Sequence, residues 1–219
     1  MALCAFAAFG AAAWAALDPE RAGLSLLLAA GALVVLGAAW LETGPSSAKE
    51  LALVATLAGV AAAGRVLFAP VPGVQPVTLI AIVTGVALGA RAGATVGALA
   101  ALASNFVLGQ GVWTPWQMLG WGLCGAAGAL ARPALRSRIV LAVFAAFLGF
   151  SFSTLMDLWQ WFSFYPHTWQ ALGVQMARGL PFDAAHAAGN LVLALVGGPE
   201  LRRVLDRYGA RLRTEVAWT

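Results

Sequence analysis

The stretch GVALGARAGATVGALAALASNFVLGQGVWTPWQMLGWGLCGAAGAL, residues 85–130, decides how this chain folds. Its apolar segments are rich in Gly and Ala, and they are interrupted once by an uncharged turn that carries Trp113, Trp116 and Gln117. Small side chains let helix backbones approach closely in lipid. A polar interruption at membrane depth must be buried in protein or line a cavity. The stretch therefore predicts packed transmembrane helices beside a small-molecule site.

The composition of the whole chain is typical of a membrane protein. Of its 219 residues, 61% are hydrophobic and only 10% are charged, which is far from the balance of a soluble domain. One crossing takes about 20 apolar residues, so no room remains for a soluble catalytic domain. We expect an all-α fold, a polytopic transmembrane helical bundle in which neighbouring helices bury the ends of the short spans. The predicted spans are residues 2–17, 23–41, 51–68, 77–90, 92–108, 116–131, 139–164 and 184–196.

The basic residues predict which way the bundle faces, because Lys and Arg accumulate at cytoplasmic ends of spans. If the first span starts inside, three basic residues lie outside, Arg21, Arg65 and Arg178. Those inside are Lys49, Arg91, Arg132, Arg136, Arg138, Arg202, Arg203, Arg207, Arg211 and Arg213. This asymmetry predicts a cytoplasmic C-terminus and explains the net charge of +4 without a nucleic-acid partner. The tail from Leu201 is expected to be a basic helix on anionic lipid headgroups, or a contact for a cytoplasmic partner.

The first span has a second interpretation, as a cleaved signal peptide. Ala13-Trp14-Ala15 has small residues on either side of a large one, as a cleavage site does. No Lys or Arg precedes the span, however, and a signal peptide begins with a basic region. An uncleaved span is the favoured interpretation.

Polar and aromatic residues gather toward the predicted outer ends of the spans and indicate a binding site there. Indole rings offer flat apolar surfaces to a ring system, and amide, carboxylate and imidazole groups supply orienting hydrogen bonds. Two alternatives stay open: the aromatic residues form an interfacial belt, and His186 satisfies a backbone group in the core. The candidate substrate-binding residues are Arg65, Gln75, Asn105, Trp113, Trp116, Gln117, Asp157, Trp161, His186 and Asn190.

Asp157 is the most informative of these candidates, because a carboxylate within a span is costly unless it faces water or a partner. We expect it to face a wet cavity or to pair with Arg65, and the wall of a ligand site is favoured over a structural ion pair. Arg65 or Arg178 is the candidate contact for an anionic group of the ligand.

Two loops are expected to close over the ligand, residues 69–76 and residues 165–181. Gly73 and Gly179 would let their backbones swing, because glycine tolerates conformations that other residues avoid.

Nothing in the sequence indicates an enzyme. The motifs HExxH, GxSxG and GxxxxGK[ST] are all missing, and neither the two His nor the pair Asp157 and Asp183 lies in a recognised catalytic or metal-binding spacing. We therefore expect no catalytic residues, no metal and no cofactor. If ATP powers this protein, the hydrolysis must take place in another polypeptide.

One apolar segment carries a stripe of small residues at a spacing of about one helical turn. Its members are Ala48, Ala52, Ala55, Gly59 and Ala63. Such a flat stripe packs against another helix, either within the bundle or in a partner protein.

From about Lys49 onward, three blocks of sequence stand out together. A helix rich in small residues ends at Gly64-Arg65 and precedes a proline-containing loop, the block GQGVWTPWQMLGWG joins two helices, and RGLPFDAAHAAGN opens the last one. In these blocks the chain resembles the substrate-binding S-components of energy-coupling factor (ECF) transporters. The resemblance covers about three quarters of the chain.

The resemblance implies a six-helix core at residues 48–219, including the basic tail, in the cell membrane of a prokaryote. The core would capture a vitamin or related micronutrient from outside and deliver it together with a transmembrane scaffold subunit and two cytoplasmic ATPases. The small-residue stripe then becomes the scaffold-docking surface. Similarity of the TPWQML junction to S-components of the corrinoid type makes cobalamin or a precursor the first choice, ahead of riboflavin, pantothenate and queuosine-type bases.

Residues 1–47 depart from this pattern and would form an N-terminal transmembrane hairpin. Two other functions remain as alternatives. One is a structural membrane protein of cell-envelope assembly with a similar helical core, against which the polar residues at the outer ends argue. The other is a standalone secondary transporter, for which an internal repeat is expected but not found.

Overall fold

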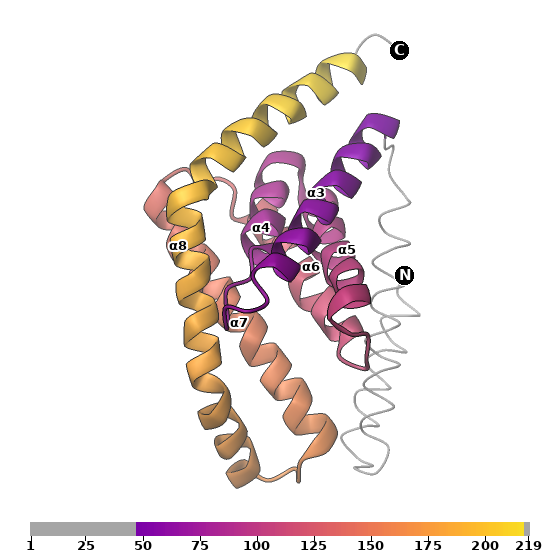
Figure 1. Ribbon diagram of the computed structural model, residues 1–219. Helices are drawn as coiled ribbons and strands as arrows, with labels where there is room; N and C mark the ends of the chain where they lie inside the picture. The colour runs from indigo at the N-terminus through magenta and orange to yellow at the C-terminus, as the bar shows by residue number, and fades with distance from the viewer. Residues whose placement is uncertain (1–46, 217–219) are drawn as a thin grey trace, which may run out of the picture.

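The computed structural model describes residues 47–216, and side chains as far as residue 212. Six α-helices and no β-strand occur in this part of the chain (Figure 1). They are α3 (Ala48–Leu67), α4 (Val77–Leu88), α5 (Ala90–Leu108), α6 (Thr114–Leu130), α7 (Arg138–Phe164) and α8 (Trp169–Val216). The predicted spans 2–17 and 23–41, and with them the N-terminal hairpin, lie outside the described residues.

The predicted all-helical membrane fold is confirmed. Four helices are long and apolar enough to cross a bilayer: α3, α5, α7 and α8. Each of the six predicted spans after residue 47 coincides with one helix, within a few residues for the first five. The protein is an α-helical membrane protein.

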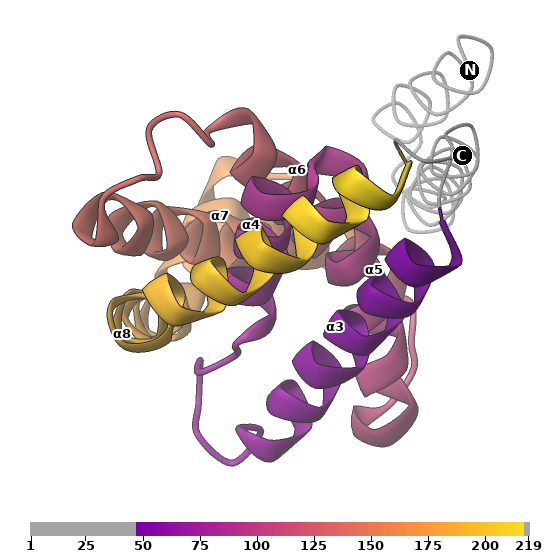
Figure 2. The ribbon, with the colours of Figure 1, turned by 90° about the horizontal axis from the view of Figure 1, so that it is seen from above.

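The short helix α4 is the centre of the bundle. All of its residues from Val77 to Ala87 are buried, and it contacts each of the other five helices. Figure 2 shows it enclosed by its neighbours when the molecule is viewed from above. Its 12 residues are fewer than a full crossing needs. Neighbouring helices bury it instead, as expected for a short apolar span.

Glycines bring α4, α5 and α6 into backbone contact. Each glycine in this contact leaves room that a side chain would fill: a Cβ on Gly85 would overlap the carbonyl oxygen of Gly125, and one on Gly97 would overlap that of Trp121. A Cβ on Gly93 would lie 2.8 Å from the carbonyl oxygen of Gly125. The close packing predicted from the Gly-rich stretch is therefore present, and it fixes how the three helices are rotated against one another.

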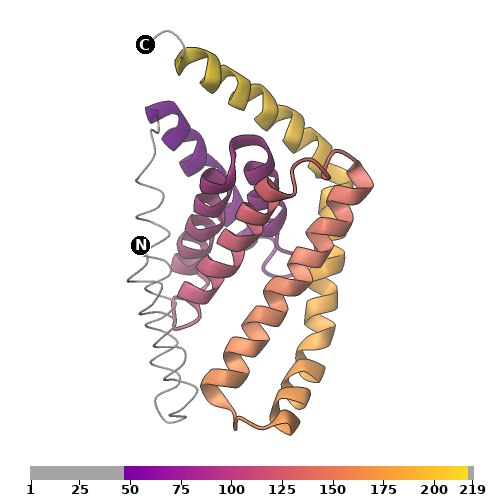
Figure 3. The ribbon, with the colours of Figure 1, turned by 180° about the vertical axis from the view of Figure 1, so that it is seen from behind.

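The ends of the bundle differ in charge. The start of α3, the turn at Gly89, residues 131–137 and the C-terminal part of α8 lie at one end, and the loops 68–76, 109–113 and 165–168 lie at the other (Figures 1 and 3). Most basic side chains belong to the first end, whereas Arg65 and Arg178 belong to segments nearer the second. The basic asymmetry between the two ends is present, and its orientation in the membrane stays a prediction.

Helix α8 differs from the expectation for the last span. It begins at Trp169 and continues through Pro181 and Pro199 to Val216, whereas the sequence predicted a loop at residues 165–181 and a span from 184. The predicted second closing loop is wrong, since only residues 165–168 connect α7 to α8. Packing along the whole of α7 holds this part of the chain in a helix despite the missing N–H of Pro181. The yellow end of α8, which contains the basic tail, runs at an angle to the rest (Figure 1), as a proline kink at Pro199 explains.

Candidate ligand-binding site

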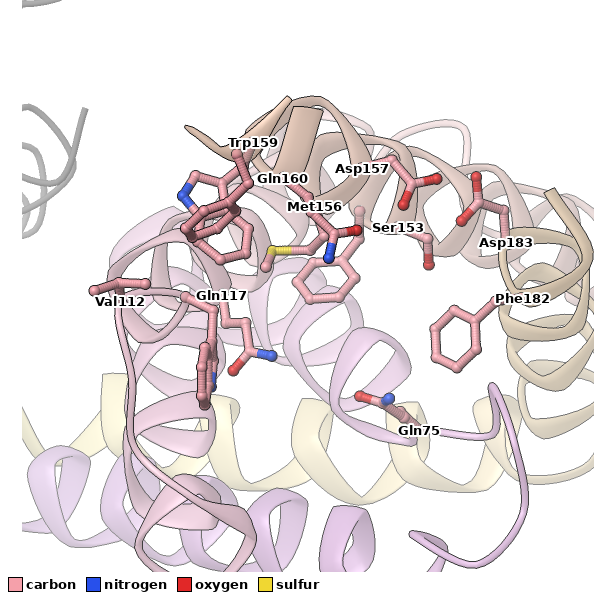
Figure 4. Close-up of a pocket in the computed structure, with 13 residues that line it drawn as sticks. Gln75, Val112, Gln117, Ser153, Met156, Asp157, Trp159, Gln160, Phe182 and Asp183 are labelled. Atoms are coloured by element: carbon pink, nitrogen blue, oxygen red, sulfur yellow. The ribbon is translucent and has the colours of Figure 1, made fainter. Parts of the chain in front are cut away.

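A cavity of about 480 Å³ lies where α6, α7 and α8 meet the loop between α3 and α4 (Figure 4). Its volume is in the range of small-molecule sites, roughly 300–1,000 Å³. The residues that line it are Gln75, Val112, Trp113, Gln117, Phe152, Ser153, Met156, Asp157, Trp159, Gln160, Phe164, Phe182 and Asp183. Aromatic rings and a few polar groups share this wall, which is the usual composition of a ligand pocket.

Two carboxylates, one on each long helix, lie beside the cavity. Asp157 of α7 and Asp183 of α8 point toward each other (Figure 4). Asp157 lies directly against Gly179, where a Cβ would overlap its Oδ2 atom. Gly179 is thus inside a helix and allows close approach of α7 and α8, and the expectation that it is the flexible point of a loop is wrong.

Asp157 has neutral hydrogen-bond partners. Its Oδ1 accepts a hydrogen bond of 3.0 Å from Nε2 of Gln175, which also donates to Oε1 of Gln160 at 2.7 Å. Its Oδ2 is buried and has no hydrogen-bond partner. The expected alternative of an ion pair with Arg65 is not found, because the guanidinium makes other bonds. Asp157 forms part of the cavity wall.

Arg65 is buried near the end of α3 and donates hydrogen bonds to three side chains. Its Nη1 lies 2.6 Å from Oγ of Ser104 and 2.6 Å from Oδ1 of Asn105, and its Nε lies 3.2 Å from Oε1 of Gln75. Its Cζ also lies 4.9 Å from the centre of the Trp121 ring, at cation–π distance. These contacts satisfy the guanidinium inside the protein, so Arg65 acts as a structural link between α3, α5 and α6.

Arg65 supports the cavity wall through Asn105. Nδ2 of Asn105 donates to Oε1 of Gln117 at 2.8 Å and to Oγ1 of Thr114 at 2.9 Å. Gln75 and Gln117, at the two ends of this network, both line the cavity. Arg178, the other candidate for an anionic group, is exposed on α8 and is not among the lining residues. The described residues thus offer no guanidinium to an anionic ligand in this cavity.

His186 and Asn190 are fully buried in the bundle and do not line the cavity. Nδ1 of His186 lies 2.6 Å from the carbonyl oxygen of Gly73, and its Nε2 lies 3.3 Å from Oγ1 of Thr78. Asn190 donates to the carbonyl oxygen of His186 at 2.9 Å. Of the two interpretations of His186, the structure favours the one in which it satisfies a backbone group. It fastens the loop 68–76, in which Gly73 has a φ of +75°, to α8.

Replacement of His186 tests whether its contact with the Gly73 carbonyl holds the loop 68–76 against α8. We expect His186→Leu to speed deuterium exchange of the backbone amides of residues 69–76 and to lower the free energy of unfolding by about 1–3 kcal/mol, because the Gly73 carbonyl loses its buried partner. The measurement is hydrogen–deuterium exchange by mass spectrometry. His167→Leu is the matched control, because His167 is exposed at the turn between α7 and α8. Unchanged exchange in residues 69–76 of the His186→Leu protein would contradict the assignment.

The three candidate tryptophans have different environments. Trp113 lines the cavity. The Trp116 ring does not, and its Nε1 is buried without a hydrogen-bond partner. Trp161 lies at the α7–α8 turn, where its Nε1 donates to the carbonyl oxygen of Pro166 and its ring packs edge-on against His167. Of the three indoles expected to hold a ring system, one is therefore in the site.

Several wall residues were missed by the sequence analysis. On α7 these are Phe152, Ser153, Met156, Trp159, Gln160 and Phe164. With Asp157 they include pairs three or four residues apart, and Phe152, Met156, Gln160 and Phe164 are successively four apart, which places them on one side of a helix. This periodicity was available in the sequence and could have identified the wall. Phe182 and Asp183 lie just before the predicted start of the last span at residue 184, so the periodicity of that span did not include them.

The fold and the site together define a class of protein: a polytopic α-helical membrane protein with a cavity of small-molecule size between its helices. The chain belongs to the DUF6580 family, a family of unknown function, whose family model matches residues 45–204. The match covers α3 to α7 entirely and most of α8. No curated protein and no solved structure matches the chain.

Proposed function

We propose that this protein is the substrate-binding membrane component of an ECF-type importer and captures a vitamin or related micronutrient. The observation that carries the proposal is the cavity of about 480 Å³ between α6, α7, α8 and the loop 68–76. A purely structural membrane protein has no need of a hollow lined by indole, amide and carboxylate groups, since such groups are costly to keep in a span.

The position of the cavity agrees with capture from outside. Its lining includes Gln75 from the loop after α3 and Val112 and Trp113 from the loop before α6. Both loops lie at the end of the bundle opposite to most basic side chains. Under the positive-inside rule, that end faces outward and the C-terminus is cytoplasmic.

The cavity volume narrows the choice of substrate. A corrinoid is much larger than a cavity of about 480 Å³ can enclose, whereas a molecule of ordinary vitamin size fits the size range of such sites. Among the vitamin-like substrates expected from the resemblance, the volume therefore favours riboflavin, pantothenate or a queuosine-type base over cobalamin.

The small-residue stripe supports a partner on α3. Ala48, Ala52, Ala55, Gly59 and Ala63 are all exposed in the structure, so within the described residues they do not serve packing of the core. In this proposal the stripe docks the transmembrane scaffold subunit, and two cytoplasmic ATPases supply the energy.

Mass spectrometry of the purified protein tests the binding role. We expect native spectra of protein in lipid nanodiscs to contain a small molecule at near-equal stoichiometry, which can be released and identified. A ligand-free protein that also binds none of the vitamins above would contradict the proposal and favour a structural role in the cell envelope. Uptake that persists in cells without any ATPase of the ECF type would favour a standalone secondary transporter.

Trp113 provides a sharper test of the cavity. We expect Trp113→Ala to lower retention of the bound molecule by about tenfold, because an aromatic contact with a ring system is lost. Trp169→Ala is the matched control, because that indole is 84% exposed at the start of α8. Ligand occupancy in native mass spectra is the measurement, and equal occupancy in the two variants would show that the molecule binds elsewhere.

A further inference from the structure

We infer that the cavity binds an organic cation, a compound that joins an ammonium group to an aromatic ring. The inference rests on the proposed function only in taking the cavity as a binding site, and it names the charge and chemical class of what binds. It follows from the placement of Asp157 and Asp183, from the groups left without partners beside them, and from the rings that complete the wall.

The two carboxylates bring negative charge that no basic group of the wall balances. Asp157 and Asp183 face each other from α7 and α8 (Figure 4), and no Lys, Arg or His is among the described residues that line the cavity. Arg65 is held by three neutral side chains. Because like charges that face each other inside a membrane repel and are poorly solvated, a bound cation would stabilise the pair.

The hydrogen bonds that the acids already make come from neutral groups. Asp157 accepts from the Gln175 amide, and no hydrogen bond or ion pair joins either acid to a basic side chain of the described residues. A neutral donor offsets less of a carboxylate's charge than an ammonium does. The pair is therefore positioned and oriented by the protein but not neutralised by it.

Two polar atoms on this side of the cavity lack a hydrogen-bond partner. Oδ2 of Asp157 is buried and unbonded, and so is Oγ of Ser153, a side chain that is only 4% exposed and belongs to the cavity wall. Figure 4 shows the Ser153 hydroxyl between Met156 and Phe182, on the side of the cavity where the carboxylates lie. A buried polar atom without a partner is unfavourable. An ammonium group, with several N–H donors, is the kind of partner that these oxygen atoms lack.

The rest of the wall suits an aromatic body. Phe152, Phe164, Phe182, Trp113 and Trp159 surround the space next to the acids. Their rings offer apolar surface for stacking, and their faces attract a cation that comes within about 6 Å. Phe152 is itself held by Trp121, whose ring is stacked on it with centroids 4.1 Å apart, so this part of the wall is rigid.

A metal ion fits the wall less well than an organic cation. No group of three or more His, Cys, Asp or Glu that could hold a metal occurs in residues 47–216. Divalent cations such as Ca²⁺ take six to eight oxygen ligands in proteins, whereas the apolar rings leave most of this wall without oxygen atoms. The geometry thus points to a ligand that carries its own apolar surface.

Three indole compounds of nearly equal size provide the test: tryptamine, which is cationic, tryptophol, which is neutral, and indole-3-acetate, which is anionic. Binding to the full-length protein in nanodiscs is measured by isothermal titration calorimetry, with empty nanodiscs as the blank. We expect tryptamine to bind at least about tenfold more tightly than tryptophol, and indole-3-acetate to bind most weakly.

Substitution of Asp157 and Asp183 tests whether the preference for the cationic compound arises in this cavity. We expect Asp157→Asn and Asp183→Asn each to weaken tryptamine binding by about tenfold and to affect tryptophol binding much less, because the amide keeps the shape of the side chain and removes its charge. Asp206→Asn is the matched control, since Asp206 pairs with Arg202 on the same helix outside this cavity. Thermal unfolding of each variant shows that it is folded, and either of the two variants is sufficient for the test.

The outcomes separate this inference from the proposed function. If tryptophol or indole-3-acetate binds as tightly as tryptamine, the cavity is a binding site and only the inference of a cation is overturned. If no indole compound binds and native spectra show no retained molecule, both the cavity's binding role and this inference fall. If the acid variants keep the full preference for tryptamine, the cation binds elsewhere and the inference is again overturned.

Discussion

Gly125→Val is expected to abolish the native bundle. Residue 125 lies where α4, α5 and α6 meet, and a Cβ there would overlap the backbone of Gly93. Because the overlapping atoms belong to backbone, no side-chain rotation relieves the clash, and α5 and α6 must separate. Overpacking of a core costs typically about 1–3 kcal/mol and more when backbone has to move, so we expect a loss of at least about 3 kcal/mol. The measurement is thermal unfolding in detergent together with the yield of monodisperse protein.

Gly59→Val is the matched control for this prediction. Gly59 lies in α3, another apolar helix, and nothing lies within 4 Å of a Cβ built on it. The same substitution there should leave the unfolding temperature close to that of the parent. If Gly125→Val were as stable as Gly59→Val, the glycine contact would not be what holds the three helices together.

Arg65→Leu is expected to have the second largest effect on stability. The guanidinium donates to Gln75, Ser104 and Asn105, and its removal leaves acceptor oxygens on these side chains without their donor in the bundle interior. Hydrogen bonds to charged groups contribute about 1.5–3 kcal/mol each, and hydrogen bonds in membrane proteins contribute less. We expect a total loss of about 3 kcal/mol in the free energy of unfolding. Chemical unfolding in mixed micelles measures it.

The arginine prediction also has a matched control and a second readout. Arg178→Leu removes an exposed guanidinium from α8 and should change the stability by less than about 0.5 kcal/mol. Because Arg65 holds Asn105, which in turn holds Gln117 at the cavity wall, the Arg65→Leu protein should also retain less ligand. An Arg65→Leu protein with parental stability would show that the network is dispensable.

Much of the fold could be predicted from the sequence. Hydropathy and helix breakers, such as the prolines of residues 70–76 and the glycines 109 and 111, are local properties, and they placed five of the six described helices within a few residues. The start of α8 at Trp169 lies well before the predicted span at residue 184, because Pro181 in the sequence indicates a helix boundary. A proline removes one hydrogen bond of a helix and crowds the preceding turn, and packing against α7 outweighs that cost.

The candidate site could be predicted only in part. Four of the predicted residues line the cavity: Gln75, Trp113, Gln117 and Asp157. Polar and aromatic residues that lie at one depth of a bundle tend to share a cavity there. Arg65, Asn105, His186 and Asn190 were expected there as well, but they belong to the buried network behind the wall. From the sequence a buried polar residue that satisfies a neighbour looks the same as one that faces a ligand.

The sequence by itself determined that this is an all-helical membrane protein, that its small residues pack helices against one another, and that its basic residues gather at one end. These properties depend on composition and on spacing along the chain, which folding does not change. Only the tertiary structure decided which polar groups meet. Arg65 bonds Asn105, 40 residues away, and Asp157 lies against Gly179 and faces Asp183 at one side of the cavity. The rotation of each helix about its own axis selects these partners, and that rotation is set by contacts between helices rather than by any one of them.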